Sequence, residues 1–437
     1  MTQALRILQE VFGYPAFRGF QEEVIEHVST GHSALVLMPT GGGKSLCYQI
    51  PALLRTGVAV IVSPLIALMQ DQVQALQRRG LAAAYLNSSL EAAEAHRIEH
   101  AFVNQALKFL YVAPERLVQE HFQAMLQSLH RAGKISLFAI DESHCIAEWG
   151  HDFRPEYRQL DVLPREYPDI PRIAVTATAD LHTRCDIQEL LGLKRERCFV
   201  DSFDRPNLHY CVTQRTAPMG QIMNFLQQHP LDSGGILYCP SRRLVEAVAN
   251  RLHLAGWPCL PYHAGMGAEV RARVQNRFLQ ESGMLMAATI AFGMGVDKPD
   301  IRFVVHLATP RSLESYYQET GRAGRDGLPA KVLLLHHPED LWVQRSHLSE
   351  GNHARSLETA CAKLDAVSHF VDDSCCRRQS LLKYFGEERD GGCGTCDVCQ
   401  PQYRHWTGPS RRHSAVSFAP SRNRRTVRRK GRKPIVG

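Results

Sequence analysis

Residues 38–45 combine glycines, a lysine and a hydroxyl side chain in an arrangement suited to binding phosphate. They read Met-Pro-Thr-Gly-Gly-Gly-Lys-Ser and stand between a β-rich apolar run and a helical pattern. Glycines let backbone N–H groups turn toward phosphate oxygens, Lys44 can reach the β- and γ-phosphates, and the Ser45 hydroxyl can hold Mg²⁺. The strict phosphate-loop pattern has glycine where this chain has Met38, so a plain glycine-rich turn is the alternative. The predicted nucleotide contacts are Thr40, Gly41, Gly42, Gly43, Lys44 and Ser45.

Two adjacent carboxylates, Asp141 and Glu142, directly follow the apolar run at residues 137–140. Parallel strands present their ligands at their C-terminal ends, so these groups are expected beside the phosphate loop. There Asp141 would hold Mg²⁺, and Glu142 would orient or deprotonate an attacking water. An acidic pair at a strand end is by itself more often a helix N-cap. Together with Lys44, the pair predicts a nucleotide hydrolase.

Arg322 and Arg325 stand three residues apart, a spacing that places both on one face of a helix. An arginine delivered across an interface between lobes stabilises charge on a transferring phosphoryl group and contributes ~10³–10⁵ in rate. Two arginines without the other motifs would indicate only a solvated basic helix face. We therefore expect catalysis to depend on a second lobe closing on the first.

Residues 147–157 interleave three aromatic side chains with charged groups. Ring faces offer sequence-tolerant stacking to nucleic-acid bases, of ~1–3 kcal/mol per base, and an arginine adds a cation. The candidate contacts are Trp149, His151, Phe153 and Arg154. The alternative is that Trp149 and Phe153, four residues apart, form a pair in the core of a helix.

Five of the thirteen cysteines lie between residues 375 and 399. Four thiolates spaced as Cys376, Cys393, Cys396 and Cys399 suit a tetrahedral Zn²⁺, and four protein ligands would make that site structural. Cys375 doubles the first position. An iron–sulfur cluster is the alternative, but a ferredoxin-like fourth cysteine would fall four residues after Cys399, at the position of Tyr403. We expect Arg377, Arg378 and Lys383 nearby to be available to phosphates.

The elements that must position these residues alternate between short apolar runs and helical patterns, which predicts α/β lobes with parallel sheets covered on both faces. We expect one lobe at residues 1–205 and a second of similar design at 206–340. A small helical zinc-binding module should occupy 341–400, followed by a basic, disordered tail at 401–437. The candidate strands are 34–38, 58–62, 108–112, 135–140 and 172–176, then 235–238, 259–262, 284–288, 303–307 and 331–335.

Composition limits the class of protein. With 44% hydrophobic and 22% charged residues, the chain of 437 is ordinary globular protein rather than disordered or collagen-like. No apolar run reaches the ~18–20 residues of a membrane span, and the N-terminus lacks a long apolar segment of a secretory signal. Eleven of the 51 lysines and arginines lie at 401–437 without any acidic residue. Since the preceding 400 residues are net acidic, bulk charge does not predict nucleic-acid binding.

In their order along the chain, these motifs resemble the RecQ family of superfamily 2 DNA helicases. The resemblance covers about residues 5–400 and includes the sequence Asp-Glu-Ser-His at 141–144. It rests also on residues 12–21, 63–72, 112–117, 175–179, 238–242, 262–265, 291–299 and 316–327. The Arg-Arg pair after Cys376 matches the zinc module that follows the second lobe in that family.

The resemblance implies two tandem RecA-like lobes and a role for each of these segments. Gln21 would pair with the adenine edge, while Tyr14 and Arg18 stack on or flank the base. Residues 63–72 and 112–117 would contact the DNA strand, and 175–179 would couple hydrolysis to motion. Arg325 would be the catalytic finger with Arg322 in support. Trp149, His151, Phe153 and Arg154 would form a loop that senses single-stranded DNA.

The activity implied is ATP-dependent 3′→5′ unwinding of single-stranded and forked DNA, with ATP, Mg²⁺ and Zn²⁺ as cofactors. The expected setting is recombination, repair, replication or the SOS response in the cytoplasm, at the nucleoid in a bacterium. We expect a monomer that meets single-strand-binding or recombination proteins and no membrane.

The family commonly continues with winged-helix and HRDC domains, for which the 38 residues after Cys399 leave no room. The alternative is therefore a DNA-stimulated ATPase that binds or anneals DNA with little unwinding. The basic tail would then be either an electrostatic clamp on DNA or a segment without a folded role.

Overall fold

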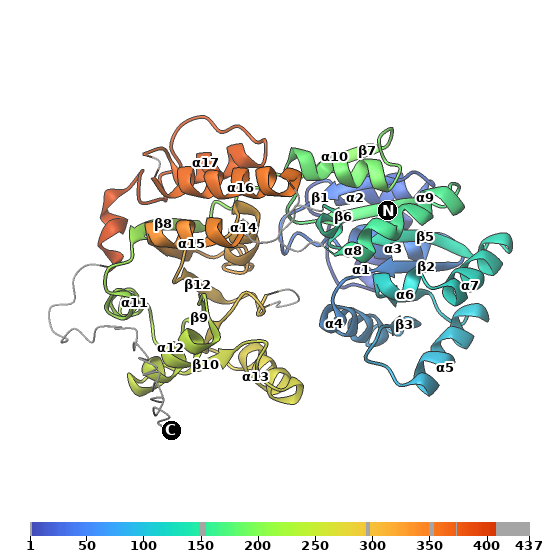
Figure 1. The fold of residues 1–437 in the computed structure, drawn as a ribbon. Helices are drawn as coiled ribbons and strands as arrows, with labels where there is room; N and C mark the ends of the chain where they lie inside the picture. Colours follow the sequence, from blue (N-terminus) through green and yellow to red (C-terminus); the bar gives the residue numbers. More distant parts are fainter. Residues whose placement is uncertain (1, 148–153, 294–297, 349–353, 373, 408–437) are drawn as a thin grey trace, which may run out of the picture.

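A computed structural model describes residues 2–147, 154–293, 298–348, 354–372 and 374–407. Two α/β lobes lie side by side, and a helical module lies along the second lobe with its helix α17 (Arg377–Tyr384) near α10 (Leu181–Leu190) of the first (Figure 1). The predicted fold class is confirmed. None of the helices in the described part of the chain is long and apolar enough to cross a bilayer.

The first lobe is built on a seven-stranded parallel sheet in the order β3-β4-β2-β5-β6-β1-β7. Its central strands are continuous apolar runs because both of their faces are buried. All five predicted strands are present, and the prediction missed two edge strands. One contains two alanines, and the other is mostly exposed. The strands are β1 (Ala34–Leu37), β2 (Val58–Val62), β3 (Ala83–Leu86), β4 (Phe109–Val112), β5 (Ile135–Ile140), β6 (Arg172–Thr176) and β7 (Arg197–Val200).

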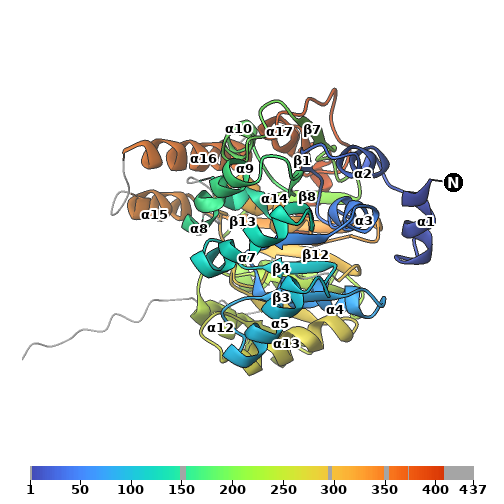
Figure 2. The ribbon, with the colours of Figure 1, turned by 90° about the vertical axis from the view of Figure 1, so that its right-hand side faces the viewer.

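Helices cover both faces of this sheet and form two separate hydrophobic cores. One core packs under α1, α2, α3 and α4, and the other under α5, α7, α9 and α10; Figure 2 shows α1 and α3 on one side of the lobe and α7 and α8 on the other. The helices not yet bounded are α1 (Gln3–Glu10), α2 (Gln21–Ser29), α3 (Leu46–Leu54), α4 (Ile66–Gln77), α5 (Ala92–Val103), α6 (Pro114–Leu117), α7 (Glu120–Arg131), α8 (Pro155–Arg158) and α9 (Val162–Glu166), with 3₁₀ turns η1 (Ser143–Ile146) and η2 (Gln159–Asp161).

The second lobe repeats the design with six parallel strands in the order β10-β11-β9-β12-β13-β8. All five predicted strands are present here too, with β8 in addition. The strands are β8 (Leu208–Gln214), β9 (Gly234–Tyr238), β10 (Cys259–Tyr262), β11 (Leu285–Ala288), β12 (Ile301–His306) and β13 (Ala330–His336). The helices are α11 (Pro218–Leu226), α12 (Arg242–Leu254), α13 (Ala268–Gln280) and α14 (Leu313–Thr320).

The module contains α15 (Pro338–Leu348), α16 (Ala354–Asp372) and α17, then the cysteine-rich loop and the 3₁₀ helix η3 (Pro401–Thr407). The folded chain therefore continues past residue 400, where we expected the disordered tail to begin. Trp406 is buried against Phe225, with ring centroids 5.8 Å apart, and Gln228 Nε2 donates to its carbonyl oxygen at 3.0 Å. Trp406 thus helps to hold this segment on the second lobe, together with Tyr403, whose ring centroid lies 5.7 Å from that of His209.

Candidate active site and metal centre

The phosphate loop joins β1 to α3, and its backbone takes the shape that glycine permits. Gly41 and Gly43 have φ of 84° and 80°, in the left-handed region that other residues avoid. Lys44 Nζ donates to the carbonyl oxygens of Met38 and Pro39 at 3.2 and 3.4 Å. Desolvation lowers the pKa of Lys44, and the nearby Glu142 and Asp141 act against that shift. Helix α3 begins directly after this loop, so the positive end of its dipole favours an anion there.

Gln21 connects the predicted base-binding segment to the phosphate loop. Its side-chain oxygen accepts from the backbone N–H of Arg18 at 2.8 Å, and its amide donates to Gly42 O at 2.9 Å. A Cβ atom on Gly43 would lie 2.4 Å from Gln21 Nε2, so that contact requires glycine. Tyr14 and Arg18 are exposed. Their contact with a nucleotide base stays a prediction.

The acidic pair lies at the end of β5, one strand away from the loop because β6 pairs with both β5 and β1. Burial, and then the charge of Glu142, raise the pKa of Asp141 to about 7, while Lys44 acts to lower it. Glu142 has φ of 47°, a left-handed conformation that is strained for a residue with a side chain. Its backbone N–H donates to Asp141 Oδ1 at 3.0 Å. A divalent cation beside Asp141 would favour the ionised carboxylate.

Two residues that the prediction did not assign to the site link the acidic pair to other segments. His144 Nδ1 lies 3.3 Å from Glu142 Oε2 and 2.9 Å from Thr176 Oγ1 at the end of β6. The Thr176 hydroxyl donates in turn to Thr178 O at 3.1 Å. Tyr157, fully buried, donates from its hydroxyl to Asp141 O at 2.9 Å. His144 belonged to the resembling motif, but no local pattern marked Tyr157.

The aromatic segment is attached to the acidic pair at both ends. It follows η1 directly, and the backbone N–H of Arg154 donates to Cys145 O at 3.2 Å. The predicted DNA contacts Trp149, His151 and Phe153 lie outside the described residues. Arg154 itself is partly exposed just before α8. Tyr157 and the η1 turn therefore connect the described ends of this segment to Asp141.

A second buried link joins the phosphate-loop helix to the segment expected to contact DNA. Gln49 on α3 donates from Nε2 to Gln72 Oε1 on α4 and to the Tyr111 hydroxyl, both at 3.1 Å. Gln49 is 4% exposed, and its bond to Tyr111 is buried while its bond to Gln72 is part-buried. This link becomes visible only when α3 lies beside α4 in the structure, because a single glutamine in the sequence does not indicate a functional contact.

The two predicted arginines point to different places. Arg325 crosses from the second lobe to the phosphate loop, where a Cβ atom on Gly41 would lie 3.6 Å from its Cγ. Its charge acts to lower the pKa of Lys44. Arg322 is 4% exposed and stays in its own lobe, beside Gly293 and Tyr238.

The expectation of one shared helix face is therefore wrong. Helix α14 ends at Thr320, and the following residues form turns that include Gly324 at φ 58°. The turns rotate the second arginine away from the first, so helical spacing no longer sets their directions.

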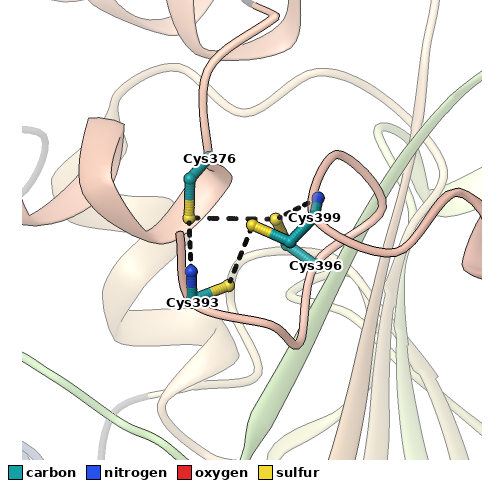
Figure 3. A group of neighbouring side chains, drawn as sticks. All are labelled: Cys376, Cys393, Cys396 and Cys399. Carbon is teal, nitrogen blue, oxygen red and sulfur yellow. Dashed lines mark hydrogen bonds between the residues drawn. The ribbon is translucent and has the colours of Figure 1, made fainter. Parts of the chain in front are cut away.

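The four predicted cysteines meet in one cluster (Figure 3). Cys393 Sγ lies 4.0 Å from Cys399 Sγ, and Cys396 Sγ lies 3.9 Å from Cys376 Sγ. A tetrahedral zinc with Zn–S bonds of ~2.3 Å would separate its sulfurs by roughly 3.8 Å, whereas a disulfide holds them at ~2.05 Å. Cys375 is exposed and does not belong to the cluster.

The surroundings of the cluster supply hydrogen bonds to its sulfurs. Backbone N–H groups of Cys393, Thr395 and Cys399 donate to cluster sulfurs at 3.3–3.4 Å. Hydrogen bonding from Cys396, and further from Thr395, lowers the pKa of Cys393, while the bond to Cys393 and burial raise the pKa of Cys396, so the thiols share protons. Metal ligands must be deprotonated, so the residues present fit a closed, structural zinc site.

The arginines after the first cysteine are not available to phosphate, contrary to our expectation. Arg377 and Arg378 are 5% and 3% exposed. Arg377 pairs with Asp397 at 3.1 Å and donates to Phe370 O, while Arg378 pairs with Asp204 at 3.0 Å. Arg377 therefore joins two parts of the module, and Arg378 joins the module to the segment between the lobes. Lys383 remains exposed.

Comparison with known families finds three matching models in order along the chain. They are the DEAD/DEAH box helicase at residues 18–187, the helicase conserved C-terminal domain at 219–327 and the RecQ zinc-binding domain at 338–400.

Similar proteins include the ATP-dependent DNA helicase RecQ of Haemophilus influenzae, 45% identical over 93% of this chain and 65% of the relative. The ATP-dependent DNA helicase RecQ of Bacillus subtilis is 40% identical over 91% of this chain and 67% of the relative. The chain thus spans about two thirds of the length of these relatives.

Solved structures with the same fold are more distant in sequence. The DUF1998 helicase MrfA bound to DNA matches with a TM-score of 0.64 and 20% identity, over 79% of this chain and 53% of that one. The DEAD-box helicase Mss116 bound to single-stranded RNA and UDP-BeF matches with a TM-score of 0.62 and 14% identity, over 88% and 89%. Both support the two-lobed arrangement.

Proposed function

The chain belongs to the RecQ family of superfamily 2 DNA helicases, and on that premise we propose that it hydrolyses ATP between its lobes to move along single-stranded DNA and unwind duplexes. The observation that carries this proposal is the position of Arg325. It lies against Gly41 of the phosphate loop although it belongs to the other lobe. A catalytic group supplied across the gap makes hydrolysis depend on lobe closure.

Each residue near the gap has a role that its position supports. Backbone N–H groups of residues 41–45 and Lys44 would bind the phosphates, and Gln21 would exchange its bond to Gly42 for the adenine edge. Ser45 and Asp141 would hold Mg²⁺, which supplies positive charge to the phosphate oxygens. Glu142, oriented by His144, would accept a proton from the attacking water. Arg325 would stabilise charge on the γ-phosphoryl group as it passes from ADP to water, with Arg322 in a supporting role.

Coupling to DNA follows from the two buried links. DNA bound at the aromatic segment would act on Asp141 through Tyr157, since the Tyr157 hydroxyl donates to Asp141 O. DNA bound along α4 would act on α3 through Gln72 and Gln49. Through these contacts, bound DNA would influence the phosphate site although the DNA itself does not contact the nucleotide.

Family membership supports the remaining features of the proposal. These are 3′→5′ polarity, single-stranded and forked DNA as substrates, and a monomer acting in the cytoplasm in recombination and repair. The zinc site would hold the module together rather than react.

Two measurements test the proposal. ATP hydrolysis should rise at least tenfold when single-stranded DNA is added, as expected for an active site completed by its substrate. Duplex with a 3′ tail should be unwound faster than duplex with a 5′ tail or blunt ends. Hydrolysis without strand displacement would favour a DNA-stimulated ATPase that binds or anneals DNA. No hydrolysis at all would refute both functions.

A further inference from the structure

The segment between the lobes makes a concentrated contact with the loop that carries Arg325. We call residues 321–325 the finger loop. The guanidinium of Arg205 donates to three of its backbone carbonyl oxygens: Gly321 at 3.3 Å, Ala323 at 3.0 Å and Gly324 at 3.1 Å. One side chain from the connecting segment therefore binds three of the five backbone carbonyl groups of the finger loop.

This contact lies just beyond the end of α14 at Thr320. The backbone N–H groups of Arg322 and Ala323 donate to the last helix carbonyls, those of Glu319 and Thr320, so Arg205 binds the carbonyl groups of the turns that follow. A guanidinium offers five N–H donors in a rigid plane, so it can hold several carbonyls in one arrangement. A lysine ammonium cannot reproduce that planar geometry.

Asn207 fixes the same loop from the other side. Its Nδ2 donates to Gly324 O at 2.8 Å and to Leu328 O at 2.9 Å. A Cβ atom on Gly324 would lie 2.4 Å from that Nδ2, and Gly324 has φ of 58°. The close approach is therefore possible only with glycine, and it sets the turn that directs Arg325.

The connecting segment is itself held by the zinc module. Asp204 pairs with Arg378 at 3.0 Å and with Arg389 at 2.5 Å. The backbone N–H of Phe203 donates to Glu387 Oε2 at 2.7 Å, and the Phe203 ring stacks on Phe385 with centroids 4.6 Å apart. Arg205 thus stands on a segment clamped by the module, directly beside the residues that make the clamp.

We propose that Arg205 is a positioning residue for ATP hydrolysis, which acts by holding the finger loop so that Arg325 meets the phosphate loop. The proposal rests on the proposed function. Arg205 touches neither the phosphate loop nor Lys44 by any bond recorded in the described structure; its effect passes through Arg325. Because the zinc module clamps Asp204, it supports the same arrangement from a distance.

The alternative is that Arg205 only anchors the connecting segment. In that case its loss would lower thermal stability but leave the turnover of folded protein unchanged. A double-mutant cycle separates the two roles, because residues that act through one another are not additive.

The test measures kcat and KM for ATP, with saturating single-stranded DNA, in Arg205→Met, Arg325→Ala and the double variant of the full chain. A misplacement of ~1 Å costs about 100-fold in rate, so Arg205→Met should lower kcat about 10- to 100-fold with little change in KM. In the Arg325→Ala background the same change should have almost no further effect. Arg205→Lys should recover only part of the rate.

A matched control is Arg55→Met. Arg55 is a part-buried arginine that also donates to backbone carbonyls, Ser136 O at 2.8 Å and Ser29 O at 3.1 Å. It lies between α3 and β2, at the N-terminal ends of the strands, whereas the phosphate loop follows the C-terminal end of β1. Its loss should lower stability and leave kcat within about twofold, the scatter expected of a contact that does not enter the transition state.

The outcomes distinguish this proposal from the one it rests on. If wild-type chain does not hydrolyse ATP, or Arg325→Ala is fully active, both proposals fail. If Arg325→Ala is impaired but Arg205→Met lowers kcat equally in both backgrounds, or not at all, only the positioning role fails. Should Arg205→Met not fold, Arg205→Gln carries the same cycle, because glutamine keeps a donor for one carbonyl.

Discussion

Buried charged groups have different partners in two regions of the molecule, the phosphate-binding end of the first lobe and the cysteine module. At the phosphate-binding end, two carboxylates adjoin one lysine, the pKa of Asp141 is raised to about 7 mainly by burial, and Glu142 is held at φ 47°. In the module, Arg377 is matched to Asp397. The difference shows that strain and uncompensated charge mark the place prepared for a ligand, whereas completed pairs mark a support.

Loss of the metal is the strongest way to break the supporting side of this comparison. Structural zinc contributes ~10–16 kcal/mol to the folding of small zinc peptides, so Cys396→Ser should unfold the module. Metal analysis should give one zinc per wild-type chain and none in the variant, with a lower melting temperature. Cys375→Ser is the matched control and should keep zinc. Iron in the wild type would contradict the assignment.

Breaking one matched pair should destabilise the fold without a direct effect on chemistry. Arg377→Met leaves Asp397, which is 1% exposed, without its main partner, and such losses cost ~3–5 kcal/mol. Chemical denaturation would measure this cost. Arg165→Met, from an exposed pair with Asp161, should cost under ~1 kcal/mol. Equal effects of the two changes would remove the distinction between supporting and surface charges.

At the phosphate-binding end of the first lobe, removal of a charged side chain should lower ATP hydrolysis and leave stability almost unchanged. Lys44→Ala should reduce ATP hydrolysis at least ~10²–10³-fold, because an aligned electrostatic group is lost, while DNA binding and the melting temperature change little. Steady-state kinetics and a DNA-binding titration give both readings. Lys108→Ala is the control, since Lys108 donates to Arg55 O and Gly57 O at the N-terminal ends of the strands. Parallel loss of hydrolysis and DNA binding in Lys44→Ala would contradict separate sites.

The smallest effect concerns pH. The pKa of Asp141 is raised from 3.8 to about 7 in the folded protein, so the native state holds this proton more tightly than the unfolded chain. Stability without ligand should therefore fall as pH rises from about 4 to about 7, and this contribution should not change above that. As pH rises from 5 to 8, Asp141→Asn should gain about 3 kcal/mol of stability relative to wild type. Denaturation at both pH values measures the difference; an unchanged difference would contradict the shift.

Local patterns of residues account for the elements that form for local reasons. Ten strands were predicted because buried parallel strands are continuous apolar runs, and the phosphate loop and acidic pair were found because their chemistry needs fixed residue types at strand ends. The cysteine spacing likewise indicated the four residues that meet. These features depend on a few neighbouring residues, so local patterns carry them.

The position and the partners of the long side chains, in contrast, depend on how distant parts of the chain pack together. Arg322 and Arg325 have the same residue type and a helical spacing, yet only Arg325 reaches Gly41. Arg377 looked available to phosphate but is buried against Asp397. Arg205 carried no signal, because its partners lie more than a hundred positions away in the chain. Such contacts arise when separate lobes and loops pack together, and no local pattern of hydrophobicity or spacing encodes that packing.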